Sequence, residues 1–246
     1  MSKLRRTGNF VRIFMINIEE CRILERTERF VAVYKPINIA VHPSDIHKHE
    51  LTLFHIVKEM IGEYLYPVHR IDRATSGIVL FALTFDAASF IRQQFNEQLM
   101  RKEYLAVLRG HLRDQCIIDH AINTPFKAER KQAATVLEPL AHTELEIPSK
   151  RYATSRFSYI KALPKTGRWH QIRLHCSYKG YPIVGDVKHG DGSTNAIARE
   201  HFGCERLLLH AYRLEFQSEE NGTQHSIVCP PDIYFSTILE RMRFPL

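Results

Sequence analysis

The feature that most constrains how this chain can fold is a short polar segment between two apolar runs. It has the sequence Pro67-Val-His-Arg-Ile-Asp-Arg-Ala-Thr-Ser-Gly77 and continues into Ile78-Val-Leu-Phe-Ala-Leu83. Apolar runs separated by a few polar residues predict two strands joined by a tight turn. Gly77 closes the polar segment, where a backbone with positive φ costs glycine least. The segment therefore predicts a turn that carries charged side chains into a second, apolar strand.

The carboxylate in this turn, Asp72, allows two interpretations. Aspartate often caps turns by accepting hydrogen bonds from backbone N–H groups, which would be a structural role. Alternatively, Arg70 and Arg73 on either side could keep a nucleophilic carboxylate ionised. Taken by itself, the turn favours the structural interpretation.

The rest of the chain alternates short apolar runs with amphipathic segments. Apolar residues at helical spacing predict a helix over 51–65, Asp86 can cap another that ends near Met100, and a basic turn is predicted at Lys127–Lys131. Further helices are expected near 196–202, over 231–242, and after a loop in 166–180. Strands are expected at 22–24, 30–34, 102–110, 116–119, 135–140, 157–163, 207–216 and 226–229. Hairpin-like neighbours without a steady βαβ repeat predict an α+β fold with a largely antiparallel sheet.

The 246 residues are enough for one large core or two small ones, and no linker or low-complexity tract divides them. We expect residues 1–17 to form a poorly ordered N-terminal extension and residues 18–246 to form one domain. No continuous apolar core with a cleavage site follows the basic N-terminus, so a secretion signal is not predicted.

The charge of the chain indicates the class of its partner. The sequence carries 34 Lys and Arg against 27 Asp and Glu, a formal net charge of +7. A basic chain attracts polyanions, and nucleic acid is favoured over an acidic membrane because no clustered lysine anchor or basic amphipathic helix occurs. No apolar span is long enough to cross a bilayer. We therefore expect a nucleic-acid partner and no membrane association.

The spacing of cysteine and histidine predicts neither a disulfide framework nor a metal site. The five cysteines are widely scattered without a C-x-x-C pair, and the fourteen histidines lack matching sets of ligands nearby. We expect no metal, and a reduced, cytoplasmic environment. His42, His69 and His210 are expected to make local hydrogen bonds rather than to act as catalysts.

Two further segments carry side chains that could act on a nucleic acid. Tyr104 lies in a predicted strand, where tyrosine usually packs, but its ring could also stack on an unpaired base. The segment Arg168-Trp-His-Gln-Ile-Arg-Leu-His175 opens a predicted helix with two arginines and two histidines, which are costly to bury without an anion. A solvated basic helix face is the alternative for this segment.

Together these segments resemble the motifs of the RluA-type pseudouridine synthases. His69-Arg-Ile-Asp-Arg-Ala-Thr-Ser-Gly77 is similar to the family signature H-R-L-D-x-x-T-S-G, and Thr166-Gly-Arg-Trp-His-Gln-Ile-Arg-Leu-His175 to T-G-R-x-H-Q-I-R-x-H. Further resemblances follow in family order at Lys35-Pro36, Lys102-Glu-Tyr104 and Pro182-Ile-Val-Gly-Asp186. The resemblance implies the pseudouridine synthase fold, a mixed, mostly antiparallel central sheet with flanking helices and a central cleft, here without the S4 domain of many relatives.

The loops Asp186-Val-Lys-His-Gly-Asp191 and Glu200-His-Phe-Gly203 are most similar to the TruC type of this family, which modifies uridine 65 of tRNA. The sequence departs from the family pattern in several places. Ile71 replaces leucine, and Cys176 stands where a larger apolar residue is usual. Asn38 stands where the family usually has glycine, although asparagine tolerates the left-handed region. The region 124–150 departs most, so no role in target recognition is carried over to it.

The resemblance implies a cofactor-free isomerisation of uridine to pseudouridine. Asp72 would be the nucleophile, acting at C1′, at uracil C6 or through a glycal, with Arg173 as its ion-pair partner. Tyr104 would stack on the base and assist transfer of the C5 proton, and Arg70 would fill the place of the extruded base. The substrate RNA is further expected to contact His69, Arg70, Lys165, Arg168, Trp169 and Leu174.

Two alternatives stay open at this point. The same chemistry could act on ribosomal RNA rather than tRNA. The chain could also be a basic RNA-binding protein without catalytic activity, in which Asp72 caps its turn. In each case we expect a monomer.

Overall fold

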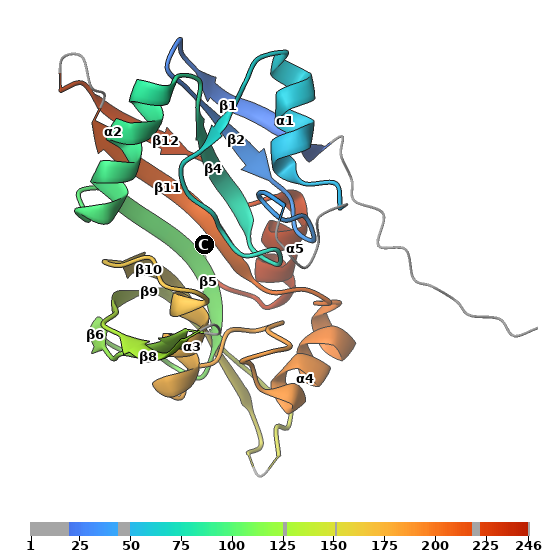
Figure 1. Ribbon diagram of the computed structural model, residues 1–246. Helices are drawn as coiled ribbons and strands as arrows, with labels where there is room; N and C mark the ends of the chain where they lie inside the picture. Colours follow the sequence, from blue (N-terminus) through green and yellow to red (C-terminus); the bar gives the residue numbers. More distant parts are fainter. Residues whose placement is uncertain (1–19, 44–49, 125–126, 151, 218–221, 246) are drawn as a thin grey trace, which may run out of the picture.

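The computed structural model describes residues 20–43, 50–124, 127–150, 152–217 and 222–245 (Figure 1). The extension predicted over residues 1–17 lies outside the described residues. None of the described helices is long and apolar enough to span a membrane. In chain order the elements are β1 (Arg22–Arg26), β2 (Phe30–Lys35), α1 (Leu53–Ile61), β3 (Tyr66–Pro67), β4 (Ser76–Ala82), α2 (Phe85–Asn96), β5 (Arg101–Arg109), β6 (Cys116–Asp119), β7 (Ile122–Thr124), β8 (Lys127–Lys131), β9 (Ala134–Leu145), β10 (Ser155–Pro164), α3 (Gln171–Tyr178), α4 (Gly192–Phe202), β11 (Leu209–Gln217), β12 (Gln224–Val228) and α5 (Ile233–Arg241).

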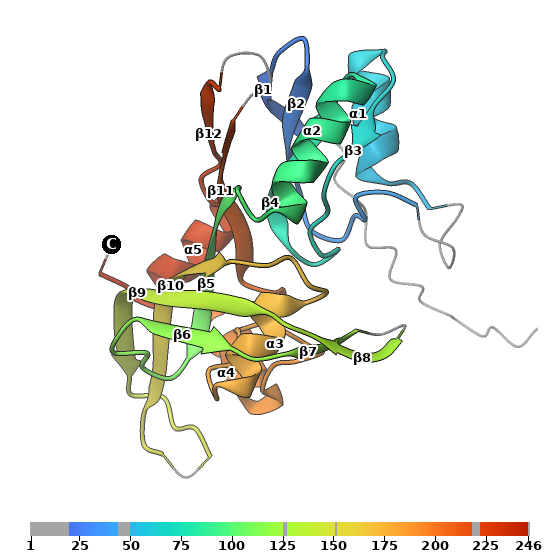
Figure 2. The ribbon, with the colours of Figure 1, turned by 60° about the vertical axis from the view of Figure 1, so that its left-hand side comes forward.

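Ten of the strands form one mixed, mostly antiparallel sheet. Its strand order is β1-β2-β4-β11-β5-β10-β9-β6, with β3 paired to β4 and β12 paired to β11. Among the described residues every pair in this sheet is antiparallel except β4 and β11, which run parallel. The separate β7–β8 hairpin projects from the sheet in Figure 2. The predicted α+β fold with a largely antiparallel sheet is confirmed.

The strands β2 and β4 are buried on both faces, between the helices α1 and α2. Successive residues of a strand point to opposite faces. Val79 of β4 therefore packs in one cluster with Leu53 of α1, whereas Leu80 packs in another with Ala88 of α2. Burial on both faces explains why β4 is a continuous apolar run rather than an alternating one.

The strands β5 and β10 are likewise covered on both faces. On one face, Ala106 shares a cluster with Cys176 of α3. On the other face, Val107 shares a cluster with Ala198 of α4 and Phe235 of α5. The helix α3 is thereby fixed against β5 and β10, in the lower part of Figure 1, whereas α1 and α2 lie in its upper part.

Two predicted helices have different ends in the structure. The helix α1 is shorter than the predicted range 51–65, because Thr52 is its N-cap and Gly62, with φ 74°, ends it. The cap of α2 is Thr84 rather than Asp86, since the Thr84 hydroxyl accepts a backbone hydrogen bond from the first turn. Asp86 instead lies in that first turn, and α2 ends before Met100.

The prediction of a basic turn at Lys127–Lys131 is wrong. These residues form β8 and pair antiparallel with β7. Lysine, glutamate and alanine are depleted in strands, so the composition hides a strand that its pairing partner defines.

Gly77 lets β4 approach β11 at the middle of the sheet. Its φ is +114°, and a Cβ at this position would lie 2.2 Å from the carbonyl oxygen of Ala211. The expectation of a positive φ at Gly77 is confirmed, and close approach of a second backbone adds a further reason for glycine here. The polar turn before Gly77 is thereby held at the junction of β4, β11 and β5.

Candidate active site

The turn that carries Asp72 connects β3 to β4. It is closed by a hydrogen bond of 3.0 Å from the Thr75 N–H to the Asp72 carbonyl oxygen. The buried Lys35 supports it from below, donating to the Arg73 carbonyl at 3.1 Å and to two carbonyls of the 36–39 loop at 2.8 and 2.9 Å. Burial lowers the pKa of Lys35 to about 7, and the Asp72 carboxylate acts in the opposite direction.

Asn38 connects the 36–39 loop to the same turn. Its φ is 65°, so the left-handed conformation that asparagine was expected to tolerate is confirmed. The Asn38 N–H donates to the Arg73 carbonyl at 2.8 Å, and Arg73 Nε donates back to the Asn38 carbonyl at 3.0 Å. The Arg73 guanidinium also pairs with Glu50 at 2.7 Å. Arg73 is therefore a structural residue of the turn, and the ion pair that the structure shows for it is with Glu50.

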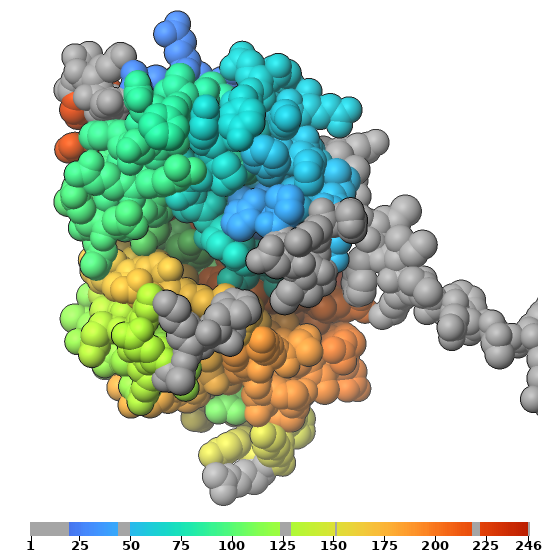
Figure 3. Space-filling view, in the orientation of Figure 1, coloured from blue at the N-terminus to red at the C-terminus, as the bar shows by residue number. Residues whose placement is uncertain are grey.

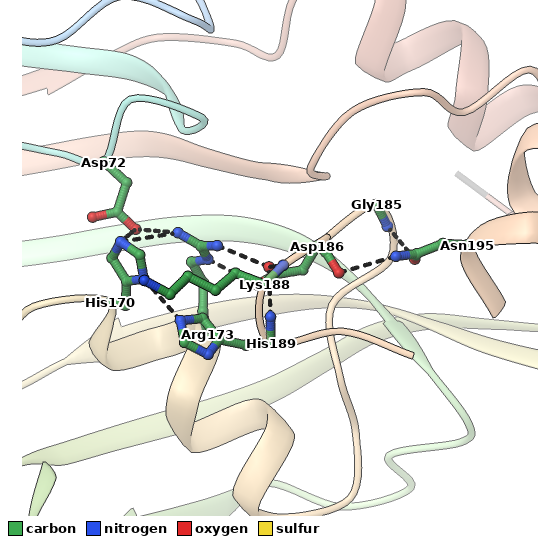
Figure 4. A network of polar contacts seen from close by, with 8 residues as sticks. All are labelled: Asp72, His170, Arg173, Gly185, Asp186, Lys188, His189 and Asn195. Carbon is green, nitrogen blue, oxygen red and sulfur yellow. Dashed lines mark hydrogen bonds and ion pairs between the residues drawn. The ribbon is translucent and has the colours of Figure 1, made fainter. Parts of the chain in front are cut away.

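The charge partner of Asp72 is Arg173, near the start of α3. Arg173 Nη1 donates to Asp72 Oδ2 at 3.1 Å (Figure 4). Among the described residues the hydrogen bond of the Asp72 side chain goes to this guanidinium, while the turn itself uses the Asp72 backbone carbonyl. The ion pair implied by the motifs is therefore present in the structure, and it is the Asp72 backbone rather than its side chain that closes the turn.

Arg173 is itself held by Asp186, which the motif reasoning left without a role. Arg173 Nε and Nη2 donate to the two carboxylate oxygens of Asp186 at 2.7 and 2.8 Å. Asp186 is 2% exposed and also accepts from the backbone N–H groups of Lys188 and His189, at 3.0 Å each. Burial alone would raise the pKa of Asp186, but the bonds from Arg173 and the two N–H groups bring it below its usual value. The motif Pro182–Asp186 was the available signal for this residue.

Tyr104 and Lys102 approach Asp72 from β5. Residues two apart on a strand share a face, and both side chains line the cavity that contains Asp72. Burial and then the charge of Asp72 raise the pKa of Tyr104 above its usual range, so the phenol keeps its proton. Burial lowers the pKa of Lys102 to about 8. Lys102 was not among the predicted site residues, although it stands in the same motif as Tyr104.

These side chains line a cavity of about 340 Å³. This volume lies within the range of roughly 300–1,000 Å³ for sites that bind small molecules. The surface is hollowed along the boundary between the upper half of the molecule and the gold and orange lower half (Figure 3). Among the described residues that line the cavity, Asp72 is the single carboxylate, and the cations are Arg70, Lys102, Arg168 and Arg173. The four cations suit an anionic substrate, and the single carboxylate, Asp72, can act on one group of that substrate.

Three of the predicted RNA-contacting residues line the cavity: His69, Arg70 and Arg168. Arg70 and Arg168 are exposed at its edge. His69 is committed to the fold, because its Nε2 accepts from the Leu80 N–H at 2.8 Å and its ring stacks on Phe95. Burial lowers the pKa of His69 to about 3, which keeps it neutral. His69 was expected to make local hydrogen bonds, and it does.

The other predicted RNA-contacting residues lie outside the described lining of the cavity. Lys165 is exposed on the loop before α3, and Leu174 is half-buried on α3. The Trp169 ring stacks on His170, with centroids 3.6 Å apart, and Lys188 Nζ lies 4.4 Å from the centre of the Trp169 ring. The Trp169 ring is therefore covered by His170 and does not offer a free stacking face on that side.

The arrangement supplies a fixed carboxylate, a protonated phenol and a cationic rim in one cavity. Such a site can attack an electrophilic centre of a polyanionic substrate or remove a proton from it, because the guanidinium holds the carboxylate in place without reacting itself. Within the described part of the chain, no group of three or more His, Cys, Asp or Glu side chains could hold a metal ion.

Known proteins are similar to this chain in sequence and in fold. Residues 29–178 match the family model described as RNA pseudouridylate synthase. The tRNA pseudouridine synthase C of Vibrio vulnificus is 36% identical over 234 residues, which cover 91% of this chain and 96% of the relative. That of Salmonella typhimurium is 40% identical over 211 residues, covering 81% of each. The solved human RNA Pseudouridylate Synthase Domain Containing 1 is 28% identical, with a TM-score of 0.69 over 87% of this chain and 84% of its own. The chain therefore belongs to the RNA pseudouridylate synthase family, in its RluA branch, as the motifs around Asp72 and Arg173 predict.

Proposed function

We propose that this protein is a tRNA pseudouridine synthase, an isomerase that converts one uridine of tRNA to pseudouridine with Asp72 as its nucleophile. The observation that carries the proposal is the placement of Asp72, Tyr104 and Arg173 on one cavity, with Asp72 and Arg173 in direct contact. These residues come from three separate segments, and each stands in a motif that the family shares.

The chemistry requires few groups. The N1–C1′ bond breaks, the uracil turns, C5 bonds to C1′, and the C5 proton is lost while N1 gains one, so no net atom or electron is gained and no cofactor is required. Asp72 reacts with the nucleoside while Arg173 holds the carboxylate in place. Tyr104 stacks on the freed uracil and assists the transfer of the C5 proton. Arg70, exposed at the rim, fills the gap that the extruded base leaves in the RNA.

Three observations support tRNA as the substrate. The relatives with the printed name tRNA pseudouridine synthase C match this chain over most of its length. The chain is basic, with a net charge of +7, and four cations line the cavity. The loop sequences Asp186–Asp191 and 200–203 resemble the TruC type, which supports uridine 65 as the target. A tRNA substrate would put the activity in the cytoplasm. Every proposed catalytic group lies within residues 18–246 of a single chain, which supports one catalytic domain that acts as a monomer.

The direct test uses purified protein and unmodified tRNA transcripts. Incubation should convert a single uridine, detected by carbodiimide labelling followed by primer extension, and replacement of uridine 65 by cytidine should abolish the signal. Mapping pseudouridine in tRNA and ribosomal RNA from a deletion strain then tests the substrate class. Loss of one tRNA site is the expected result, whereas loss of a ribosomal site with intact tRNA would contradict the proposed substrate.

A further inference from the structure

Two histidines extend the polar network behind Arg173 (Figure 4). His170 Nδ1 lies 2.8 Å from His189 Nε2, and His170 Nε2 lies 3.2 Å from Arg173 Nη1. His170 precedes α3 and His189 belongs to the loop that follows Asp186, so the contact joins two separate segments. The same Arg173 Nη1 group is the donor to Asp72.

These contacts determine where the imidazole protons are. A guanidinium can only donate hydrogen bonds, so His170 Nε2 must present its lone pair to Arg173. The proton of a neutral His170 is then on Nδ1, which donates to His189 Nε2, and His189 must carry its own proton on Nδ1. This assignment is testable because free histidine prefers the opposite tautomer, with the proton on Nε2.

The surroundings favour a neutral His170. The positive groups that face it are Arg173 and Lys188, and the negative group is Asp72, whose Oδ2 is 3.8 Å from His170 Nε2. Burial first, and then the cations, lower the pKa of His170 to about 4 against the opposing effect of Asp72. Burial likewise lowers the pKa of His189, which faces Arg173 and Lys188 as cations and Asp186 and Asp72 as anions.

We propose that His170 and His189 are positioning residues: joined as two neutral imidazoles, they hold Arg173 Nη1 in the orientation that aims it at Asp72. This inference rests on the proposed function only in that Asp72 is taken as the reacting group. Without an acceptor at His170 Nε2, one of the two Nη1 protons would have no partner in this arrangement, and the guanidinium could turn about its bonds to Asp186. Arg173 Nη1 is thus constrained twice, by its ion pair with Asp72 and by its hydrogen bond to His170.

The backbone holds His170 for this role. His170 has φ 51°, in the left-handed region that residues other than glycine and asparagine rarely adopt, and it takes this conformation as the N-cap of α3. Its side chain makes no capping hydrogen bond. The ring is clamped instead by Trp169, whose plane lies 13° from that of His170. The left-handed turn thus places the imidazole on Arg173 rather than on the helix terminus.

Trp169 makes the protonation state of His170 directly measurable. It is the single tryptophan of the sequence, and an indole stacked on an imidazolium loses much of its fluorescence whereas one stacked on a neutral imidazole does not. Emission of the wild-type protein should stay level as the pH falls from about 8 to about 5 and drop only near 4. The variant His170→Gln, which cannot titrate, should lose that drop. A quenching midpoint at or above the free value of about 6.5 would show an imidazolium paired with Asp72 and would overturn the proposal.

The tautomers are measured by ¹⁵N NMR of histidine-labelled protein, with His170→Gln and His189→Gln to assign the signals. We expect His170 to carry its proton on Nδ1 in the wild type and in His189→Gln, whose amide oxygen can still accept. In His189→Leu the acceptor is lost, and the proton should move to Nε2. A wild-type His170 protonated on Nε2 contradicts the proposal without any variant having to fold.

Activity provides the second readout. His189→Leu should lower kcat about 10- to 100-fold with little change in KM, the range seen when groups that orient a site residue are removed. His189→Gln should recover most of the lost rate. Full activity in His189→Leu would overturn the positioning role. If the wild type had the expected tautomers but converted no tRNA, the proposed function would fail and the imidazole pair would stand.

Discussion

Asp72 Oδ2 and Arg173 Nη1 lie 3.1 Å apart, although 101 residues separate them in the chain. Arg173 makes this contact with the one nitrogen that Asp186 leaves free, since Asp186 takes Nε and Nη2. The guanidinium is thus fixed by a buried carboxylate before it meets the reactive one. A planar group with three nitrogens in fixed directions is required to serve both carboxylates at once.

Arg173→Lys should therefore lose most of the activity. A lysine ammonium keeps the charge but cannot bond both oxygens of Asp186 and also reach Asp72. Arg173→Met should be worse for the fold, because it leaves Asp186 buried without its partner, and such losses cost about 3–5 kcal/mol. Steady-state kinetics on tRNA and chemical unfolding measure the two effects.

The matched control is Arg168→Lys, which changes an exposed arginine of the same cavity. It should leave the free energy of unfolding within about 0.5 kcal/mol of the wild type and affect mainly KM. Near-normal kcat in Arg173→Lys would show that the bidentate geometry is not needed.

Gly77→Ala should destabilise the protein strongly. The added Cβ would lie 2.2 Å from the Ala211 carbonyl oxygen, and the φ of +114° is strained for alanine. Backbone strain alone costs on the order of 1–3 kcal/mol, and the clash adds to it. Gly192→Ala is the control, because nothing lies within 4 Å of its Cβ position at the start of α4. Equal unfolding midpoints for the two variants would contradict the close approach of β4 and β11.

Lys102 should give the reaction an alkaline limit. Its pKa is lowered to about 8, so the cation is present below this pH and is lost as the pH rises through it. Because kcat/KM reports the groups of the free enzyme, kcat/KM should fall above about pH 8. Lys102→Arg, which stays charged, should move this limb to higher pH. If kcat/KM of Lys102→Arg still fell at the same pH as in the wild type, the titrating group would be another residue.

Arg70 should matter most when the target base is paired. Extruding a stacked, paired base costs a few kcal/mol, and each 1.4 kcal/mol is a factor of ten. Arg70→Ala is therefore expected to slow conversion of folded tRNA by about tenfold or more, and to affect a short unpaired RNA with the same target much less. The comparison of the two substrates is made by single-turnover kinetics, with the exposed Arg113→Ala as control. Equal losses on both RNAs would exclude a role in holding the helix open.

The central turn and its neighbours could be predicted from the sequence because their signals are local. The apolar run 78–83 and the closing Gly77 define a strand and its turn from adjacent residues alone. In the same way, Asn38 could be assigned a left-handed conformation from its side chain and its place after Lys35-Pro36.

The partners of these residues depend on tertiary structure, and there the sequence was less informative. Arg70 and Arg73 flank Asp72 in the sequence and could keep it ionised, but in the structure Arg73 bonds the Asn38 carbonyl and pairs with Glu50. The motif Pro182–Asp186 marked Asp186 but did not reveal that it bonds Arg173. His189 follows on a loop without a periodic pattern, so nothing local reveals its contact with His170. The strand β8 was missed for a related reason, because its lysines and glutamate resemble a solvated turn until β7 pairs with them.

The most direct test of the account is tritium release from RNA labelled at uridine C5, measured with Asp72→Asn. Asparagine keeps the size of the side chain and an oxygen for Arg173, so the variant should match the wild type in circular dichroism and unfolding midpoint. Asp114→Asn, an exposed carboxylate on a loop, is the control and should release tritium normally. The account predicts no detectable release from Asp72→Asn; release at the wild-type rate would contradict Asp72 as the reacting carboxylate.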